Sequence, residues 1–312
     1  MDFSFAAFSK SFFHTLAGSD AIKQAASRYG MRRPSSFARR FIAGETVQEA
    51  IDAARVIETS GMLVTLDYLG ESVASIDEAA AATREYLNVI DAIAASGAGR
   101  NISLKLTQLG LDVDRATTVD NLRRILDRAT PHDFFVRIDM ESSGYTERTI
   151  EVFETLWHQG YRNAGVVIQS YLRRSEADVR RMNALGARVR LVKGAYKEPK
   201  AAAYQAKSEV DAQFLVLMRL LLDEGVYPAI ATHDPAMIDA TRAYAKSTGY
   251  ASNRFEFQML YGIRRDLQAQ LNSEGYPFRV YVPFGKEWFP YFMRRLGERP
   301  ANVMFVAKSL LK

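Results

Sequence analysis

Short apolar segments alternate with amphipathic segments along the chain from Gly61 almost to its end. The apolar segments end in polar side chains, a pattern typical of buried parallel strands. We predict strands at residues 62–67, 101–106, 134–139, 164–169, 187–192, 226–232, 254–258 and 278–282. Between them apolar residues recur at helical spacing, which predicts helices at 76–95, 120–128, 147–159, 175–184, 207–224, 235–244 and 264–273.

This order of elements predicts the fold. Strands that alternate with helices indicate a parallel sheet, and eight units with a uniform rhythm favour closure into a (βα)₈ barrel of the TIM type. A dinucleotide-binding fold is disfavoured because Gly97-Ala98-Gly99, the fragment nearest to a GxGxxG fingerprint, precedes a strand instead of following one. We expect the barrel at residues 61–312, preceded by an N-terminal helical segment, residues 1–60, that packs on it.

Composition and charge exclude several classes of function. The 312 residues include no cysteine, so disulfides, thiolate metal sites, cysteine nucleophiles and attachment of a flavin through cysteine are excluded. The net charge is +5, but basic and acidic residues are interleaved, and no nucleic-acid-binding arm is expected. No apolar run approaches the ~20 residues of a membrane span. Phe5, Phe8, Phe12 and Leu16 predict an amphipathic helix packed on the protein, with a membrane or a second subunit as alternatives.

Polar side chains recur where the predicted strands end, which in a (βα)₈ barrel is the active-site face. One charged residue there is readily explained by a structural ion pair, whereas a set at nearly every strand end indicates a shared function. A metal site is disfavoured because His233 alone among four histidines reaches the predicted mouth. The set comprises Asp67, Glu71, Lys105, Gln108, Asp139, Glu141, Gln169, Arg190, Lys193, Tyr196, Thr232, His233, Asp234, Gln258, Tyr261 and Tyr281.

Two chemistries compete for these residues. Lys105 and Lys193 lie at strand ends, where a lysine can form an imine with a carbonyl substrate, as in a Schiff-base lyase. The end of the chain favours another chemistry. A final helix is predicted at about residues 287–298, with Pro290 in its first turn. Adjacent arginines with a helical glutamate suit capture of a carboxylate, although a solvated helix with an ion pair is the alternative. Tyr291, Arg294 or Arg295, and Glu298 share one face.

The segment YVPFGKEWFPYFMRRLGERPAN resembles the C-terminal signature of the proline dehydrogenase family, which includes free enzymes and domains of bifunctional proline-utilisation proteins. The motifs SLKLTQLG, VRIDME, VIQSYL, RLVKGAY, ATHD and FEFQMLYGIR agree with it in order, so the resemblance covers roughly residues 60–305. It implies a distorted (βα)₈ barrel that binds FAD non-covalently without a Rossmann domain, with the last helix capping the substrate. The absent glycine fingerprint and the absent cysteines agree with that.

The resemblance also implies roles for individual residues. Asp139 and Arg190 are implied to support catalysis, and we expect Asp139 to tether a lysine or arginine instead of abstracting a proton. Tyr281 is expected to disfavour 4-hydroxyproline by pressing against the substrate ring. The implied substrate-binding residues are Lys105, Leu260, Tyr281, Arg294 and Arg295, with Glu298 orienting the arginine pair, and the implied FAD-binding residues are Met140, Gln169, Arg190, Val192, Lys193, Gly194, Tyr196, Thr232, His233 and Gln258.

The implied reaction is the oxidation of L-proline to Δ¹-pyrroline-5-carboxylate, with hydride transfer to N5 of FAD, as the first step of proline catabolism. A quinone is the implied electron acceptor, and a separate pyrroline-5-carboxylate dehydrogenase is a candidate partner. We expect a cytoplasmic enzyme without metal or nucleic acid, and leave open a peripheral contact with the inner face of the membrane. A lyase on the same barrel and a flavin-free binding protein are the alternatives, which a flavin spectrum distinguishes.

Overall fold

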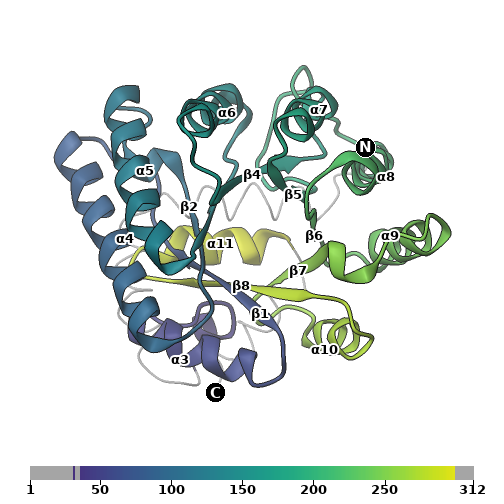
Figure 1. The fold of residues 1–312 in the computed structure, drawn as a ribbon, viewed down its shortest axis with the longest axis horizontal. Coiled ribbons are helices and arrows are strands. Elements are labelled where there is room, and N and C mark those ends of the chain that lie inside the picture. Colours follow the sequence, from purple (N-terminus) through teal and green to yellow (C-terminus); the bar gives the residue numbers. More distant parts are fainter. Residues whose placement is uncertain (1–30, 32–35, 299–312) are drawn as a thin grey trace.

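The computed structural model describes residue 31 and residues 36–298. Eight parallel strands form a closed barrel in sequence order, which confirms the predicted fold class (Figure 1). The strands are β1 (Leu63–Tyr68), β2 (Asn101–Leu104), β3 (Phe135–Ile138), β4 (Ala164–Gln169), β5 (Arg188–Val192), β6 (Ala229–Ala231), β7 (Glu256–Leu260) and β8 (Phe278–Phe284).

The barrel closes where its first and last strands pair. β1 and β8 are in register from Leu63 opposite Arg279 to Tyr68 opposite Phe284. Side chains point alternately into the barrel and out toward the helices, so both faces of a strand are covered. In β4 every residue is buried for this reason. All eight carboxyl ends meet at one face, which brings together polar residues that are far apart in the sequence.

Amphipathic helices surround the barrel, and their boundaries follow from local chemistry. Ser75 and Asp114 accept backbone hydrogen bonds at the starts of α4 and α5, and Gly97 and Gly186 end α4 and α7 in the left-handed conformation that glycine adopts at low cost. The helices are α4 (Ile76–Ser96), α5 (Arg115–Ala129), α6 (Ser143–His158), α7 (Ser175–Leu185), α8 (Lys207–Glu224), α9 (Pro235–Ser247) and α10 (Arg265–Ser273).

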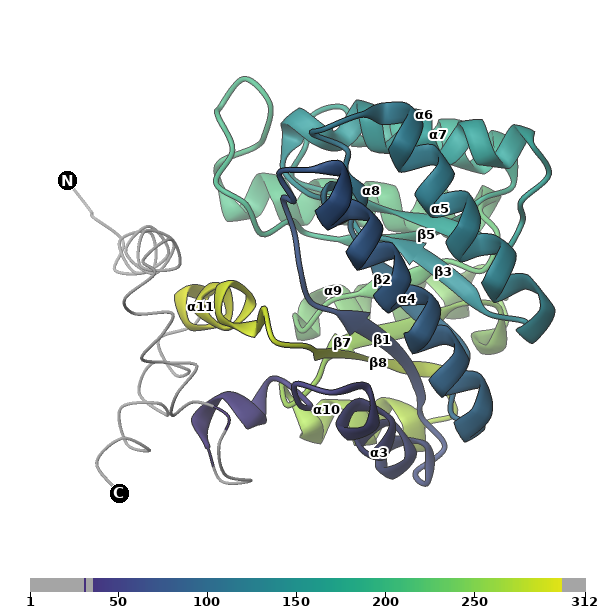
Figure 2. The same ribbon diagram turned by 90° about the vertical axis from the view of Figure 1, so that its left-hand side faces the viewer.

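The helix that follows β8 does not join this ring. Figure 2 shows α11 (Trp288–Glu298) lying beyond the carboxyl ends of the strands, and Figure 1 shows it across the middle of the barrel. The outer position beside β1 and β8 is taken by α3 (Val47–Glu58), which contacts both strands. α11 is held in place by an apolar cluster in which the ring of Phe292 contacts the rings of Phe41 and Trp288, next to the short helix η1 (Phe37–Arg40).

The eight predicted strands, the helices between them and the final helix are found, with differences at their ends. β2 stops at Leu104 because residues Leu106–Leu109 form a 3₁₀ helix, η2, that ends at Gly110 with a left-handed φ of 102°. The predicted N-terminal amphipathic helix, with Phe5 to Leu16, lies outside the described residues, so the packing of residues 1–60 as one segment stays a prediction. None of the described helices has the length and hydropathy of a membrane span.

Candidate active site

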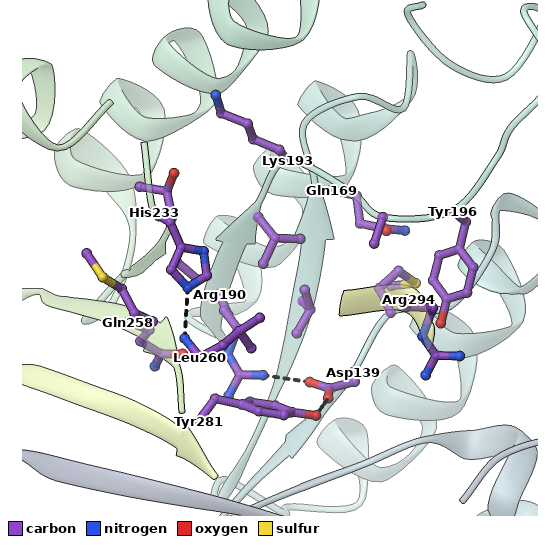
Figure 3. A pocket seen from close by; sticks show the side chains of 18 of the residues that line it. Asp139, Gln169, Arg190, Lys193, Tyr196, His233, Gln258, Leu260, Tyr281 and Arg294 are labelled. Carbon is purple, nitrogen blue, oxygen red and sulfur yellow. Dashed lines mark hydrogen bonds and ion pairs between the residues drawn. The ribbon is translucent and has the colours of Figure 1, made fainter. Parts of the chain in front are cut away.

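A cavity of about 440 Å³ lies at the carboxyl ends of the strands, beneath α11, in the size range of small-molecule sites. It is lined by every catalytic, substrate-binding or FAD-binding residue implied by the resemblance whose side chain the structure describes (Figure 3). Of the predicted strand-end set, Asp67, Glu71, Gln108, Glu141 and Tyr261 do not line it. The side chain of Glu298 lies outside the described residues, so its predicted role toward the arginine pair stays a prediction. The lining residues include Lys105, Asp139, Met140, Gln169, Arg190, Val192, Lys193, Gly194, Tyr196, Thr232, His233, Gln258, Leu260, Tyr281, Arg294 and Arg295.

Asp139 is the centre of a buried hydrogen-bond network. Arg190 donates from Nη1 to Asp139 Oδ1 at 2.6 Å, and Tyr281 donates from its hydroxyl to Oδ2 at 2.7 Å (Figure 3). Burial, together with the negative charge of Asp139, raises the pKa of Tyr281 well above its usual value, so the phenol keeps the proton that it donates. Arg190 also donates to Ser103 at 3.1 Å. Each oxygen of Asp139 therefore already accepts a hydrogen bond, as expected of a tether.

Lys105 supplies a buried positive charge beside this network. Its Nζ is 3.7 Å from an oxygen of Asp67, a carboxylate with no exposed surface. Burial alone would lower the pKa of Lys105, but the charges of Asp67 and Asp139 raise it above its usual value. For Asp67 burial is the larger effect and raises the pKa, although Lys105 opposes it. The lysine is therefore an ammonium ion, suited to binding an anion and unsuited to attacking a carbonyl.

α11 adds two arginines from above the strand ends. Arg294 and Arg295 follow Tyr291 at i+3 and i+4, so one helical face presents all three to the cavity. Arg294 donates to Glu71 at 2.8 Å. Burial would lower the pKa of Arg294, but Glu71 and Tyr196 outweigh it and keep the guanidinium charged. Arg294 and Arg295 thus line the same cavity as Lys105.

The remaining lining residues are held by contacts with their own surroundings. Gln169 donates to the backbone oxygen of Glu141 at 2.9 Å, and Lys193 forms ion pairs with Asp211 and Asp234 at 2.5 and 2.6 Å. His233 accepts at Nε2 from the backbone N–H of Leu260 at 3.0 Å (Figure 3). These bonds fix the side chains before any ligand arrives.

Glycine is required at position 194 by the shape of the chain. Its φ is +111°, and a Cβ there would lie 2.4 Å from the ring of Tyr171. Backbone without a side chain therefore lines this part of the cavity, which permits close approach of a ligand.

Sequence reasoning missed several partners and lining residues. Asp67 and Glu71 were recognised as polar strand-end residues, but nothing in the sequence paired them with Lys105 and Arg294. Lys207, three-quarters exposed at the start of α8, reaches the cavity and carried no signal. Among the described residues, no group of three or more histidines and carboxylates is arranged to hold a metal ion. Other lining residues outside the predictions are Val167, Ala195, Ala231 and Met259.

The chain is similar to known proteins along most of its length. The family model for proline dehydrogenase matches residues 50–308. Proline dehydrogenase 1 of Bacillus subtilis is 43% identical over 297 residues, which cover 95% of this chain and 97% of that protein. Proline dehydrogenase of Deinococcus radiodurans is 40% identical over 281 residues, covering 89% of this chain and 91% of that protein.

A solved structure agrees with the barrel. The crystal structure of proline utilization A from Bdellovibrio bacteriovorus, inactivated by N-propargylglycine, superposes with a TM-score of 0.78 at 28% identity. The match covers 83% of this chain but 32% of that protein, so this chain spans about a third of its length. The extent of the family match and the identities of 40–43% confirm the resemblance in the strand-end motifs: the chain belongs to the proline dehydrogenase family.

Proposed function

We propose that this protein oxidises L-proline to Δ¹-pyrroline-5-carboxylate with non-covalently bound FAD as its cofactor. The observation that carries the proposal is the cavity that Lys105, Arg294 and Arg295 line together with the Asp139–Arg190–Tyr281 network. The positive charges of Lys105, Arg294 and Arg295 suit a small carboxylate substrate. Family membership supports the same reaction.

The cavity fits a flavin chemically. Met140, Val167 and Val192 give it an apolar lining on which an aromatic ring system can pack, and the backbone is bare at Gly194. Arg190 Nε is buried and has no hydrogen-bond partner among the described residues, so a donor is left for a ligand atom. Met140, Gln169, Arg190, Val192, Lys193, Gly194, Tyr196, Thr232, His233 and Gln258 are the residues that would hold the cofactor. FAD, when bound, supplies a two-electron acceptor that takes a hydride at N5.

The cations bind and orient the substrate carboxylate. Arginine binds a carboxylate through paired N–H donors, and Lys105 adds a point charge in the same cavity. Arg294 donates to Glu71 from Nη1, so Glu71 orients the guanidinium while its other N–H groups can bind the substrate carboxylate. Holding the carboxylate at fixed positions places the proline ring between Leu260 and Tyr281, which converts binding energy into orientation.

Asp139 positions its neighbouring side chains, and Arg190 provides a positive charge in the site. Asp139 keeps the Arg190 guanidinium and the Tyr281 hydroxyl in place, and Arg190 stabilises negative charge that develops beside it. Two electrons leave the substrate as a hydride from the ring carbon, and the ring nitrogen loses a proton, which balances the C=N bond of the product. Tyr281 presses against the ring and disfavours a 4-hydroxyl group.

A quinone as electron acceptor, a separate pyrroline-5-carboxylate dehydrogenase and a cytoplasmic location, with peripheral contact at the inner membrane face as an alternative, complete the proposal. They rest on the family resemblance. Relatives named bifunctional protein PutA, such as the Escherichia coli one at 30% identity, are matched over 23% of their length. Copurification with vesicles or with the dehydrogenase tests the partners separately from the chemistry.

The absorbance spectrum of the purified protein, followed by anaerobic addition of L-proline, tests the reaction. Flavin bands that bleach with L-proline, and persist with D-proline, support the proposal. Flavin that stays oxidised contradicts proline as substrate, and protein that takes up no FAD contradicts the cofactor. The competing Schiff-base lyase predicts that borohydride traps substrate on Lys105 or Lys193, which the protonated state of Lys105 disfavours.

A further inference from the structure

A buried hydroxyl–carboxylate pair lies beside the cavity without lining it. Thr107 has no exposed surface, and Glu141 is 5% exposed. The Thr107 hydroxyl donates to Glu141 Oε2 at 2.7 Å, and the Thr107 backbone N–H donates to Oε1 at 3.3 Å. Thr107 follows Lys105 by two residues and Glu141 follows Asp139 by two, so the pair joins the segments just beyond two site residues.

The same threonine holds the segment that follows β1. Ser72 donates from its backbone N–H to the Thr107 hydroxyl at 3.0 Å, and Val73 donates to the Thr107 backbone oxygen at 3.2 Å. Ser72 has a φ of +57°, a left-handed conformation that a residue with a Cβ adopts at a cost, so outside contacts must hold it. The residue before it, Glu71, accepts the hydrogen bond from Arg294 at 2.8 Å.

The pair is also connected to the other side of the cavity. The backbone oxygen of Glu141 accepts from Gln169 at 2.9 Å. A continuous set of hydrogen bonds therefore runs from Gln169 through Glu141 and Thr107 to Ser72, adjacent to Glu71. Buried, satisfied networks of this kind fix backbone positions, because any displacement leaves a polar group without a partner.

We propose that Thr107 and Glu141 are positioning residues for the substrate-carboxylate site. The Thr107 hydroxyl donates a hydrogen bond to Glu141 and accepts one from the Ser72 backbone. These two hydrogen bonds keep Glu71 within hydrogen-bond distance of Arg294. The hydrogen bond between Arg294 and Glu71 orients the guanidinium, and the affinity for the substrate carboxylate depends on this orientation. The inference rests on the proposed function for its kinetic consequence, and its structural part stands without it.

Thr107→Val tests the proposal because valine keeps the shape of threonine and removes the hydroxyl, and Thr107→Ser is the matched control that keeps it. We expect Thr107→Val to raise KM for L-proline by about tenfold, the equivalent of one to two hydrogen bonds, with kcat and FAD content changed by less than about twofold. Thr107→Ser restores KM. In a Glu71→Gln background, Thr107→Val has little further effect on KM, because the two changes act on one contact.

Amide hydrogen exchange tests whether Thr107 holds the segment after β1, and it does not depend on an activity assay. Thr107→Val should speed exchange of the Ser72 and Val73 amides, while amides in β5 exchange as in the parent protein. Unchanged exchange at Ser72 and Val73 overturns the proposal. So does a double variant in which the effects of Thr107→Val and Glu71→Gln on KM are fully additive. If Thr107→Val does not fold, Glu141→Gln replaces it with the same exchange readout. Absence of proline oxidation in the parent protein instead contradicts the proposed function.

Discussion

Replacing Asp139 tests whether this carboxylate tethers its neighbours or takes the substrate proton. Asp139→Ala leaves the Arg190 guanidinium in the barrel without its counter-ion and the Tyr281 hydroxyl without its acceptor. Asp139→Asn keeps the shape and one acceptor oxygen but removes the charge. The two variants therefore separate loss of charge from loss of the contact.

The size of the effect follows from burial. Arg190 and Asp139 are joined at 2.6 Å with side chains 5% and 13% exposed. Removing one partner of a buried pair costs about 3–5 kcal/mol, whereas losing one charged hydrogen bond costs about 1.5–3 kcal/mol. Asp139→Ala is therefore expected to lower Tm by about 6–20 °C, at about 2–4 °C per kcal/mol for a domain of this size, and Asp139→Asn by roughly half as much.

Two assays decide the outcome. Thermal unfolding of both variants measures the tether, and kcat/KM for L-proline as a function of pH in Asp139→Asn tests proton abstraction. A tether predicts lower Tm, lower activity and an unchanged acidic limb. Loss of the acidic limb would identify Asp139 as the proton acceptor and refute the tether. Asn163→Ala, which removes a hydrogen bond to Thr130 just before β4 begins, is a control for the effect on unfolding of a polar residue away from the site.

The other predictions concern charge and space. Lys105→Met should raise KM for L-proline by at least about tenfold, with FAD content unchanged; an unchanged KM would remove this lysine from the carboxylate site. Gly165→Ala should destabilise the barrel by about 1–3 kcal/mol in urea unfolding, because a Cβ would lie 2.4 Å from the Arg188 backbone oxygen, and a neutral result would contradict the packing. Burial raises the pKa of Glu256, but the charge and hydrogen bonds of Arg279 outweigh burial and lower the pKa below its usual value of 4.5. Its contribution to stability is thus present above pH 4.5 and lost as pH falls below it, so the difference between the parent and Glu256→Gln should shrink at acid pH; a constant difference would refute it.

The sequence determined the architecture of this protein because periodicity reports burial. The strand at Ala164–Gln169 is apolar up to its terminal glutamine because it is covered on both faces, and the helix at Lys207–Glu224 carries a helical repeat of apolar residues. Its order of elements permits few folds, and eight alternating units point to one. The strand-end motifs then identified the cavity residues, because parallel strands bring all their carboxyl ends to one face.

Only the tertiary structure decided which of those residues pair. Asp67 with Lys105 and Glu71 with Arg294 join residues far apart in the chain, and Thr107 connects to both Glu141 and Ser72 through one hydroxyl. No local pattern encodes such contacts, because they depend on side-chain directions and on how closely separate strand ends approach one another in the folded barrel. The pKa directions of Lys105 and Asp67 follow from the same geometry, since burial and neighbouring charge exist only once the chain is folded.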